Sequence, residues 1–178
     1  MRNFKLALCA LALTATSASA LAAGEVTQGT VTFNGELVAD TCSIVDESVN
    51  RIVTLPKVST QTLAKAGDAA GSKGFDLNVE KCPSTVTQVA AHFEAIGSSG
   101  VDSATGNLTN TDASGAKEVE VRLYNSDEKQ LKLGESGNPF PVDADGKATL
   151  RYYGGYYATG ATTAGKVNAK AQYTLVYP

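Results

Sequence analysis

Short runs of alternating apolar and polar residues, separated by glycine-, proline- and asparagine-rich turns, predict an all-β chain with an immunoglobulin-like sandwich fold. About seven to nine such runs can be read, at the spacing expected of that sandwich. The longest lies at the end of the chain, over residues 167–177. The length of 178 residues fits one domain once any leader is removed.

The N-terminus has the features of a secretory signal peptide. Arg2 and Lys5 precede an apolar run over residues 6–13, which is too short to cross a bilayer, and small residues follow at 18–20. These features predict a signal peptide over residues 1–23 and an exported, soluble product. We expect the mature chain to start between residues 21 and 24.

Residues 24–38 form an alternating run ahead of the first cysteine of the mature chain. Its residues on one parity include Thr27, Gly29, Val31 and Phe33, with polar residues mostly between them. One interpretation is the first strand of the sandwich. The other is a detachable arm that pairs with another subunit, because the run has no obvious partner within the fold.

The mature chain keeps two cysteines. Cys9 leaves with the leader, so Cys42 and Cys82 remain as a pair in an exported protein, where disulfides persist. We therefore predict a structural disulfide that closes a loop of about 40 residues and contributes about 4 kcal/mol of stability. A metal site is disfavoured, because His92 is the only histidine and two cysteines are too few soft ligands.

The middle of the chain contains shorter strand patterns and several breakers. Predicted strands lie at residues 37–45, 52–55, 75–79, 86–96, near 108, 119–123, 131–133 and 148–157. Residues 58–73 read as a loop, with one helical turn at 62–66 as the alternative. Two prolines make residues 139–142 extended but unable to form a central strand. The glycine pair 154–155 predicts a bulge or bend.

The terminal run is the clearest strand in the sequence. From residue 167 to residue 177 the odd positions are mostly apolar and the even positions mostly polar, with no interior glycine or proline. No later segment can pair with its far side. A long, half-apolar strand at the end of the chain is a good template for another chain.

The sequence offers no constellation for catalysis and indicates no cofactor or metal. His92 has no patterned Ser, Cys or acidic partner, and the simplest reading of Glu118 and Glu120 is a solvated strand face. Asp143-Ala-Asp-Gly lacks the remaining ligands of a calcium loop and reads as a turn. A net charge of −3 without a basic run argues against nucleic acid as a partner. The tyrosines at 152–157 favour core or subunit packing over sugar stacking.

Taken together, the chain resembles the pilin subunits of chaperone–usher fimbriae, and most closely the major subunit family of type 1 fimbriae. The residues that carry the resemblance are GTVTFNGELVADTCSI (29–44), Cys82, YYATGA (156–161), Gly165 as fourteenth residue from the end, and Tyr177-Pro178. The similarity covers essentially the whole chain. The terminal proline departs from the pattern, but at the last position the missing N–H costs little.

The resemblance implies an immunoglobulin-like sandwich that lacks its final strand and is completed by a donor strand from a partner. It implies a signal peptide over residues 1–23, a donor-strand extension over 24–34 and a pilin domain over 35–178. The donor strand would present Thr27, Gly29, Val31 and Phe33, with Val31 and Phe33 as anchors. The acceptor groove along the C-terminal strand would involve Gly165, Ala169, Ala171, Tyr173, Leu175 and Tyr177.

The implied function is structural: a subunit that polymerises head to tail by donor-strand exchange into the shaft of a surface fimbria and supports adhesion, without catalysis. The implied partners are identical or related pilin subunits, a periplasmic chaperone and an outer-membrane usher. The alternatives are a minor adaptor subunit and a secreted carbohydrate-binding adhesin domain. A detachable arm distinguishes the polymer subunit from a monomeric binding domain, which has no need for one.

Overall fold

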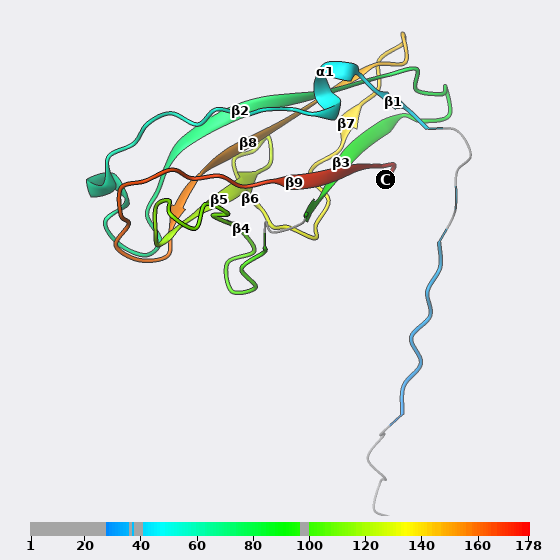
Figure 1. Cartoon of the computed structure of the whole chain (residues 1–178). Helices are drawn as coiled ribbons and strands as arrows, with labels where there is room; N and C mark the ends of the chain where they lie inside the picture. Colours follow the sequence, from blue (N-terminus) through cyan, green and yellow to red (C-terminus); the bar gives the residue numbers. More distant parts are fainter. Residues whose placement is uncertain (1–27, 36, 38–40, 97–99) are drawn as a thin grey trace, which may run out of the picture. The chain divides into compact units, whose positions relative to one another are not determined.

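The computed structural model describes residues 28–35, 37, 41–96 and 100–178 (Figure 1). The predicted leader, residues 1–23, and Thr27 of the predicted arm lie outside these residues. The chain divides into two units, residues 1–37 and 38–178. The described part of the first unit contains no helix or strand. Among the described residues, no helix is long and apolar enough to cross a membrane.

The regular secondary structure of the second unit is almost entirely β, as predicted. Its elements, in chain order, are β1 (Ser43–Ile44), α1 (Asp46–Val49), the 3₁₀ helix η1 (Thr60–Leu63), β2 (Ala69–Glu80), β3 (Gln88–Ala95), β4 (Leu108–Thr109), β5 (Val119–Tyr124), β6 (Gln130–Leu131), β7 (Phe140–Pro141), β8 (Ala148–Ala158) and β9 (Ala171–Val176).

The larger sheet has the order β1–β2–β8–β5–β4, with β6 paired to β5, and all its described pairs are antiparallel. The long strand β8 is central because it pairs with β2 on one side and β5 on the other. Figure 1 shows β2 and β8 running side by side along the body. The strand predicted at residues 37–45 is much shorter, since only Ser43–Ile44 pairs with β2 among the described residues.

The irregularity predicted at the glycine pair of β8 lies on the neighbouring strand instead. The register shifts between Ala70 and Lys73, where two residues of β2 face the single residue Gly155 of β8. Gly71 has a φ of 68°, in the left-handed region that favours glycine. A Cβ on Gly155 would lie 3.1 Å from the Cα of Ser72. The glycine of β8 therefore admits the bulge that β2 makes.

The smaller sheet has the order β7–β3–β9. The proline-containing strand β7 pairs with β3 over only two positions and forms one edge, as expected for a segment with a missing backbone donor. The strand β9 forms the other edge and pairs with β3 over six positions, from Ala171↔Ala95 to Val176↔Ala90. The two sheets give the immunoglobulin-like sandwich that the sequence predicts.

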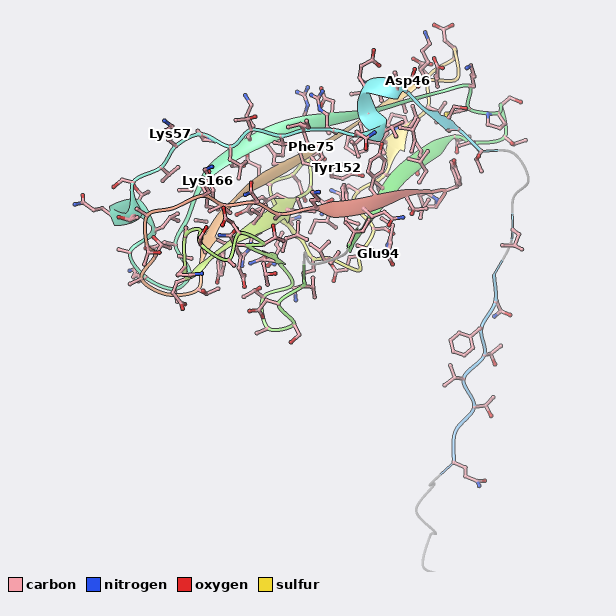
Figure 2. All side chains as sticks on the ribbon, viewed as in Figure 1. Asp46, Lys57, Phe75, Glu94, Tyr152 and Lys166 are labelled. Atoms are coloured by element: carbon pink, nitrogen blue, oxygen red, sulfur yellow. A yellow bond between two sulfur atoms is a disulfide. The ribbon has the colours of Figure 1, made fainter. Side chains whose placement is uncertain are left out.

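The core between the sheets is centred on Tyr152, which is fully buried. Its ring makes edge contacts with Phe93 of β3 and Phe140 of β7, with centroids 5.1 and 5.6 Å apart. Its hydroxyl accepts a hydrogen bond from the Ala91 N–H at 3.1 Å and so ties β8 to β3. Figure 2 places Tyr152 beside Phe75 in the middle of the unit. At this tyrosine, core packing is confirmed over sugar stacking.

The predicted disulfide between Cys42 and Cys82 is present, and both cysteines are buried. The N–H of Cys82 also donates to the carbonyl of Gly146 at 3.0 Å. Gly146 has a φ of 69°, and an added Cβ there would lie 2.8 Å from the Cys82 carbonyl oxygen. The disulfide therefore fixes the segment before β1 to the residues that directly follow β2, and the hydrogen bond from Cys82 fixes those residues to the turn before β8.

Replacing both cysteines, as Cys42→Ser with Cys82→Ser, is expected to lower the free energy of unfolding by about 4 kcal/mol, because the unfolded chain regains the freedom of a loop of about 40 residues. Denaturant titration of the oxidised protein and the double variant measures the loss. Reduction of the natural protein serves as the control and should reproduce it. Equal midpoints for all three samples would contradict the stabilising role of the bond.

Candidate functional site

The strand β9 is paired on one side only. Its ladder with β3 uses the backbone groups that point toward β3. Within the described part of the chain, no strand pairs with its opposite edge. Backbone N–H and C=O groups on a free edge need partners, and such an edge is a template for a further strand.

The inward-facing side chains of this strand are only partly covered. Ala171, Tyr173, Leu175 and Tyr177 pack against the main core, as their shared parity predicted, but all four are only half-buried. By contrast, the neighbouring β3 positions Val89, Ala91 and Phe93 are at most 3% exposed. The core is therefore thinner along the free edge of β9 than it is one strand away.

Two tyrosine hydroxyls connect this region to the segment around the first cysteine. The Tyr173 hydroxyl donates to the carbonyl of Ser48 at 2.8 Å. The Tyr177 hydroxyl accepts from the N–H of Cys42 at 3.0 Å. Burial raises the pKa of Tyr173, so its hydroxyl stays protonated and able to donate at neutral pH. Neither partner could be anticipated from the sequence pattern, because the pairs are 125 and 135 positions apart.

The strand predicted from residue 167 begins only at Ala171, so the prediction of its length is wrong. Residues before it are extended but bonded elsewhere: the carbonyl of Asn168 accepts from the N–H of Thr111 at 2.8 Å, and that of Lys166 from the N–H of Ala116 at 2.9 Å. Ala169 lies in this approach segment and is half-buried.

Gly165 also lies outside β9, where its small size is required by packing. A Cβ on Gly165 would overlap the backbone of Gly115 and Ala116. This glycine lets residues 165–168 lie directly against the loop over residues 110–116. It therefore positions the entry to β9, and its contacts are with that loop.

The prediction of a strand at residues 52–55 is also wrong. None of residues 51–58 takes part in a sheet ladder or in another backbone–backbone hydrogen bond among the described residues. Val53 packs against the main core, while Ile52 is 86% exposed. A second extended segment of this unit thus lacks strand pairing.

The described part of the predicted arm is an extended segment that pairs with no strand among the described residues. Gly29, Val31 and Phe33 lie in a stretch without helix or strand, and the two large side chains are 76% and 91% exposed. Exposed large apolar side chains at alternate positions indicate a segment suited to burial against a partner.

A polar cluster beside β5 is the main rival site. The structure contradicts the expected solvation of Glu120, which is 5% exposed. Its Oε2 accepts from Thr105 Oγ1 at 2.8 Å and from Asn107 Nδ2 at 2.9 Å. The fully buried Asn107 also accepts, through Oδ1, from Arg122 Nε at 3.1 Å. The cluster satisfies itself internally and fastens the 102–107 loop to the sheet.

Other sequence candidates take part in ordinary structural contacts. His92 lies on β3 with Nδ1 3.1 Å from Ser136 Oγ. The Asp143 carboxylate accepts from the N–H groups of Asp145 and Lys147, which is a turn, as predicted. The guanidinium of Arg122 covers one face of Tyr157 at 3.5 Å. No group of three potential metal ligands occurs among the residues that the structure describes.

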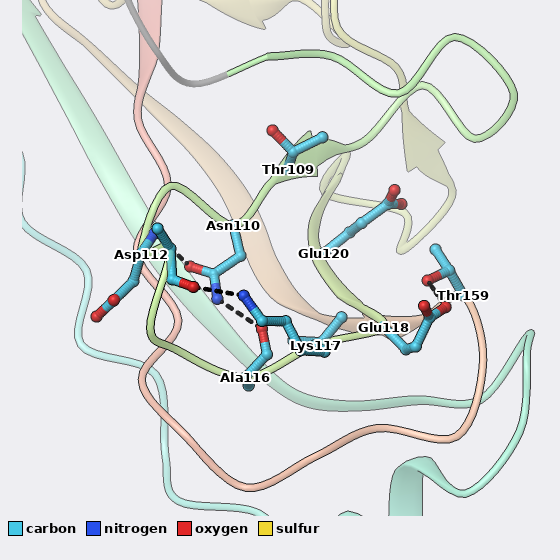
Figure 3. A pocket seen from close by; sticks show the side chains of 10 residues that line it. Thr109, Asn110, Asp112, Ala116, Lys117, Glu118, Glu120 and Thr159 are labelled. Atoms are coloured by element: carbon cyan, nitrogen blue, oxygen red, sulfur yellow. Dashed lines mark hydrogen bonds between the residues drawn. The ribbon is translucent and has the colours of Figure 1, made fainter.

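A pocket of about 230 Å³ lies between residues 109–120 and Thr159, and Figure 3 shows side chains that line it. Thr159 Oγ1 donates to the Glu118 carboxylate at 3.0 Å, and Lys117 Nζ donates to the carbonyl of Ala113 at 2.5 Å. Because these groups are already partnered by the protein, the free edge of β9 remains the stronger candidate site.

Similarity to known proteins points in the same direction. Residues 29–178 match the family model described as fimbrial protein. The chain is 41% identical to the F17 fimbrial protein of Escherichia coli, covering 93% of this chain and 94% of that protein. It is 38% identical to the major fimbrial subunit SMF-1 of Stenotrophomonas maltophilia, covering 90% and 98%. A solved chaperone–usher pilus structure shares the fold, with a TM-score of 0.61 at 22% identity, covering 85% and 96%.

The buried carboxyl of Glu120 should make stability depend on pH. Desolvation raises its pKa, and this effect outweighs the hydrogen bonds from Asn107 and Thr105, which lower it. The hydrogen bond with Asp102 also raises the pKa of Glu120, while the Ala104 N–H holds the pKa of Asp102 below its usual range. A raised folded-state pKa stabilises the fold below the ordinary Glu value of 4.5, and this contribution is lost as pH rises through the folded-state value. Glu120→Gln should therefore gain stability relative to the natural protein as the pH rises above 4.5, as measured by thermal unfolding.

The exposed neighbour Glu118 provides the control, because Glu118→Gln makes the same change of charge at the surface. That variant should follow the pH profile of the natural protein. If the stability of Glu120→Gln depended on pH in the same way as that of the natural protein, the burial of Glu120 and its contact with Asp102 would not affect the free energy of unfolding.

Proposed function

The chain belongs to the fimbrial protein family and is a structural subunit of a surface fimbria, and from this premise we propose that its copies join by strand donation. In this proposal the arm over residues 24–34 of one copy pairs with the free edge of β9 in the next. Residues 35–178 form the domain that receives it, and residues 1–23 are the signal peptide removed on export.

The observation that carries the proposal is the one-sided pairing of β9 beside a thin part of the core. A strand added there would satisfy the free backbone groups of β9 and cover its half-buried side chains at the same time. Alternate side chains of the added strand would face the core, so the strand needs apolar residues at every second position.

The arm has the required pattern. Thr27, Gly29, Val31 and Phe33 share one parity, and the intervening residues are mostly polar. Burial of a large apolar side chain contributes about 1.5–3 kcal/mol, so Val31 and Phe33 would be the main anchors. Gly29 would occupy a place that has no room for a side chain, and Ala169, Ala171, Tyr173, Leu175 and Tyr177 would face the arm.

The geometry of the contact accounts for a filament. The arm and β9 are different surfaces of the chain, so each subunit would use one surface to bind the copy ahead and the other to bind the copy behind. Such a head-to-tail contact leaves a free arm and a free edge at the two ends. It can be repeated without closing into a dimer.

A free strand edge also creates a need for protection before assembly, because it promotes aggregation. We propose that a periplasmic chaperone lends a strand to β9 until the next arm replaces it, and that an outer-membrane usher orders the exchange. No catalytic step by the subunit is required, since the exchange makes and breaks only non-covalent bonds.

The shaft is favoured over the other roles. The Stenotrophomonas relative is named a major fimbrial subunit, which favours a repeated shaft subunit over a minor adaptor. The carbohydrate-binding alternative is weakened because Tyr152 is in the core and Arg122 covers one face of Tyr157.

Removal of the main anchor should block assembly. In cells that express the complete fimbrial operon, Phe33→Asp should abolish filaments in electron micrographs, because a carboxylate would have to enter the apolar core. Deletion of residues 24–33 should have the same effect. In both cases the domain should remain soluble in complex with its chaperone.

The matched control is Thr32→Asp, which introduces the same charge at the neighbouring position of opposite parity. It should still form filaments, because that side chain would face solvent in the added strand. Filaments of normal length from Phe33→Asp would refute the assignment of the arm, and loss of filaments in both variants would refute the assigned parity.

A further inference from the structure

Tyr173 and Tyr177 connect β9 with the chain around Cys42, and both use backbone groups as their partners. Tyr173 donates to the Ser48 carbonyl, and Tyr177 accepts from the Cys42 N–H. Because the partners are backbone groups, these hydrogen bonds form only when the backbone at Cys42 and Ser48 lies at the right place in space, whatever side chains those residues carry. The two hydroxyls therefore fix the separation between β9 and residues 42–48.

The far ends of these two bonds are held in place. Cys42 is linked covalently to Cys82. The Oγ atom of Ser48 accepts from the N–H of Asn78 in β2 at 2.9 Å, and the carbonyl of Asn78 accepts from the N–H of Val45 at 3.0 Å. Ser48 is 1% exposed. Both anchor points thus belong to the framework of the larger sheet.

The near ends are held as well. Tyr173 lies in β9, whose ladder with β3 is continuous over six positions, and Tyr177 directly follows the last residue of that strand. The ring of Tyr173 lies against that of Phe93, with centroids 6.2 Å apart, and Phe93 is 3% exposed. Tyr173 is therefore fixed by its ring and backbone at one end and by its hydroxyl at the other, while Tyr177 packs against the main core and is fixed by its hydroxyl.

We propose that Tyr173 and Tyr177 are positioning residues that keep the free edge of β9 open to an incoming strand. This inference rests on the proposed function. A vacant strand position leaves its neighbours about 9–10 Å apart, twice the spacing of paired strands. Since half-buried apolar side chains line β9, the hydrophobic effect favours closure of that space. The two hydroxyl contacts oppose closure, because they hold β9 at a fixed distance from Cys42 and Ser48.

The consequence concerns the rate of strand uptake. An arm that meets an open edge can pair at once, whereas a collapsed edge must first reopen. Once the arm is bound, its own backbone bonds hold β9, and the tyrosine contacts add little. Loss of a hydroxyl should therefore slow association and leave dissociation nearly unchanged.

The test uses the mature chain carrying Phe33→Asp, so that its own arm does not compete, and a synthetic peptide of residues 24–34. Tyr173→Phe and Tyr177→Phe each remove a hydroxyl and keep the ring. Each should lower the second-order rate constant of peptide uptake by about fivefold, the equivalent of one hydrogen bond of about 1 kcal/mol. The dissociation rate should change by less than about twofold.

Tyr153→Phe is the matched control, because this tyrosine lies on β8, outside the open edge, with its ring over Gly74 of β2. Ser48→Ala provides a second route: it removes the Oγ that accepts from Asn78 and should slow uptake even if a tyrosine variant folds poorly. The thermal unfolding midpoint of each variant is measured as well. A general loss of stability would lower this midpoint but would leave the rate constant of peptide uptake by folded molecules unchanged.

The possible outcomes distinguish the two claims. If the chain with both tyrosines fails to take up the peptide, the proposed strand donation is wrong. If it takes up the peptide and the phenylalanine variants do so at the same rate, strand donation stands and the positioning role is wrong. Slower uptake by both variants and by Ser48→Ala, with normal uptake by Tyr153→Phe, supports the inference.

Discussion

The free edge of β9 imposes the constraint on which the rest of the structure depends. Its outward backbone groups need partners, and the side chains beside them are half-buried. Most of the fold must therefore be stable without the strand that would cover this edge. The long β2–β8 ladder, the buried Tyr152 and the Cys42–Cys82 bond provide that stability without the added strand. The centre of the domain is thus stabilised by many contacts, while β9 at one edge is paired on one side only among the described residues.

Much of this fold could be predicted from the sequence, because a strand with one buried face shows a period of two. The parity of β9 and the strand at residues 148–157 follow that period. The length of β9 does not, since Asn168 has the right parity but bonds to Thr111 instead of β3. The bulge was similarly displaced: the glycine pair of β8 signals it, yet the extra residue belongs to β2.

The errors at the site have one physical cause, which is that loops and distant contacts leave no trace in local alternation. Glu120 alternates with apolar neighbours as a solvated residue does, but the loop over residues 102–107 covers it. The partners of Tyr173 and Tyr177 lie more than a hundred residues away. Conversely, the side of β9 that packs against the core follows from parity alone, whereas the described residues 28–35 of the arm are exposed at both parities.

The position of Cys42 has a mechanical consequence for a fimbria built by strand donation. Tension would enter each domain from its arm, just before Cys42, and leave through β9. At Cys42 the force can cross the disulfide directly to Cys82, so residues 43–81 between the cysteines carry little load. The same cysteine bonds to Tyr177 at the exit strand. The pulling path is therefore short, and most of the sandwich lies outside it when the fibre is stretched.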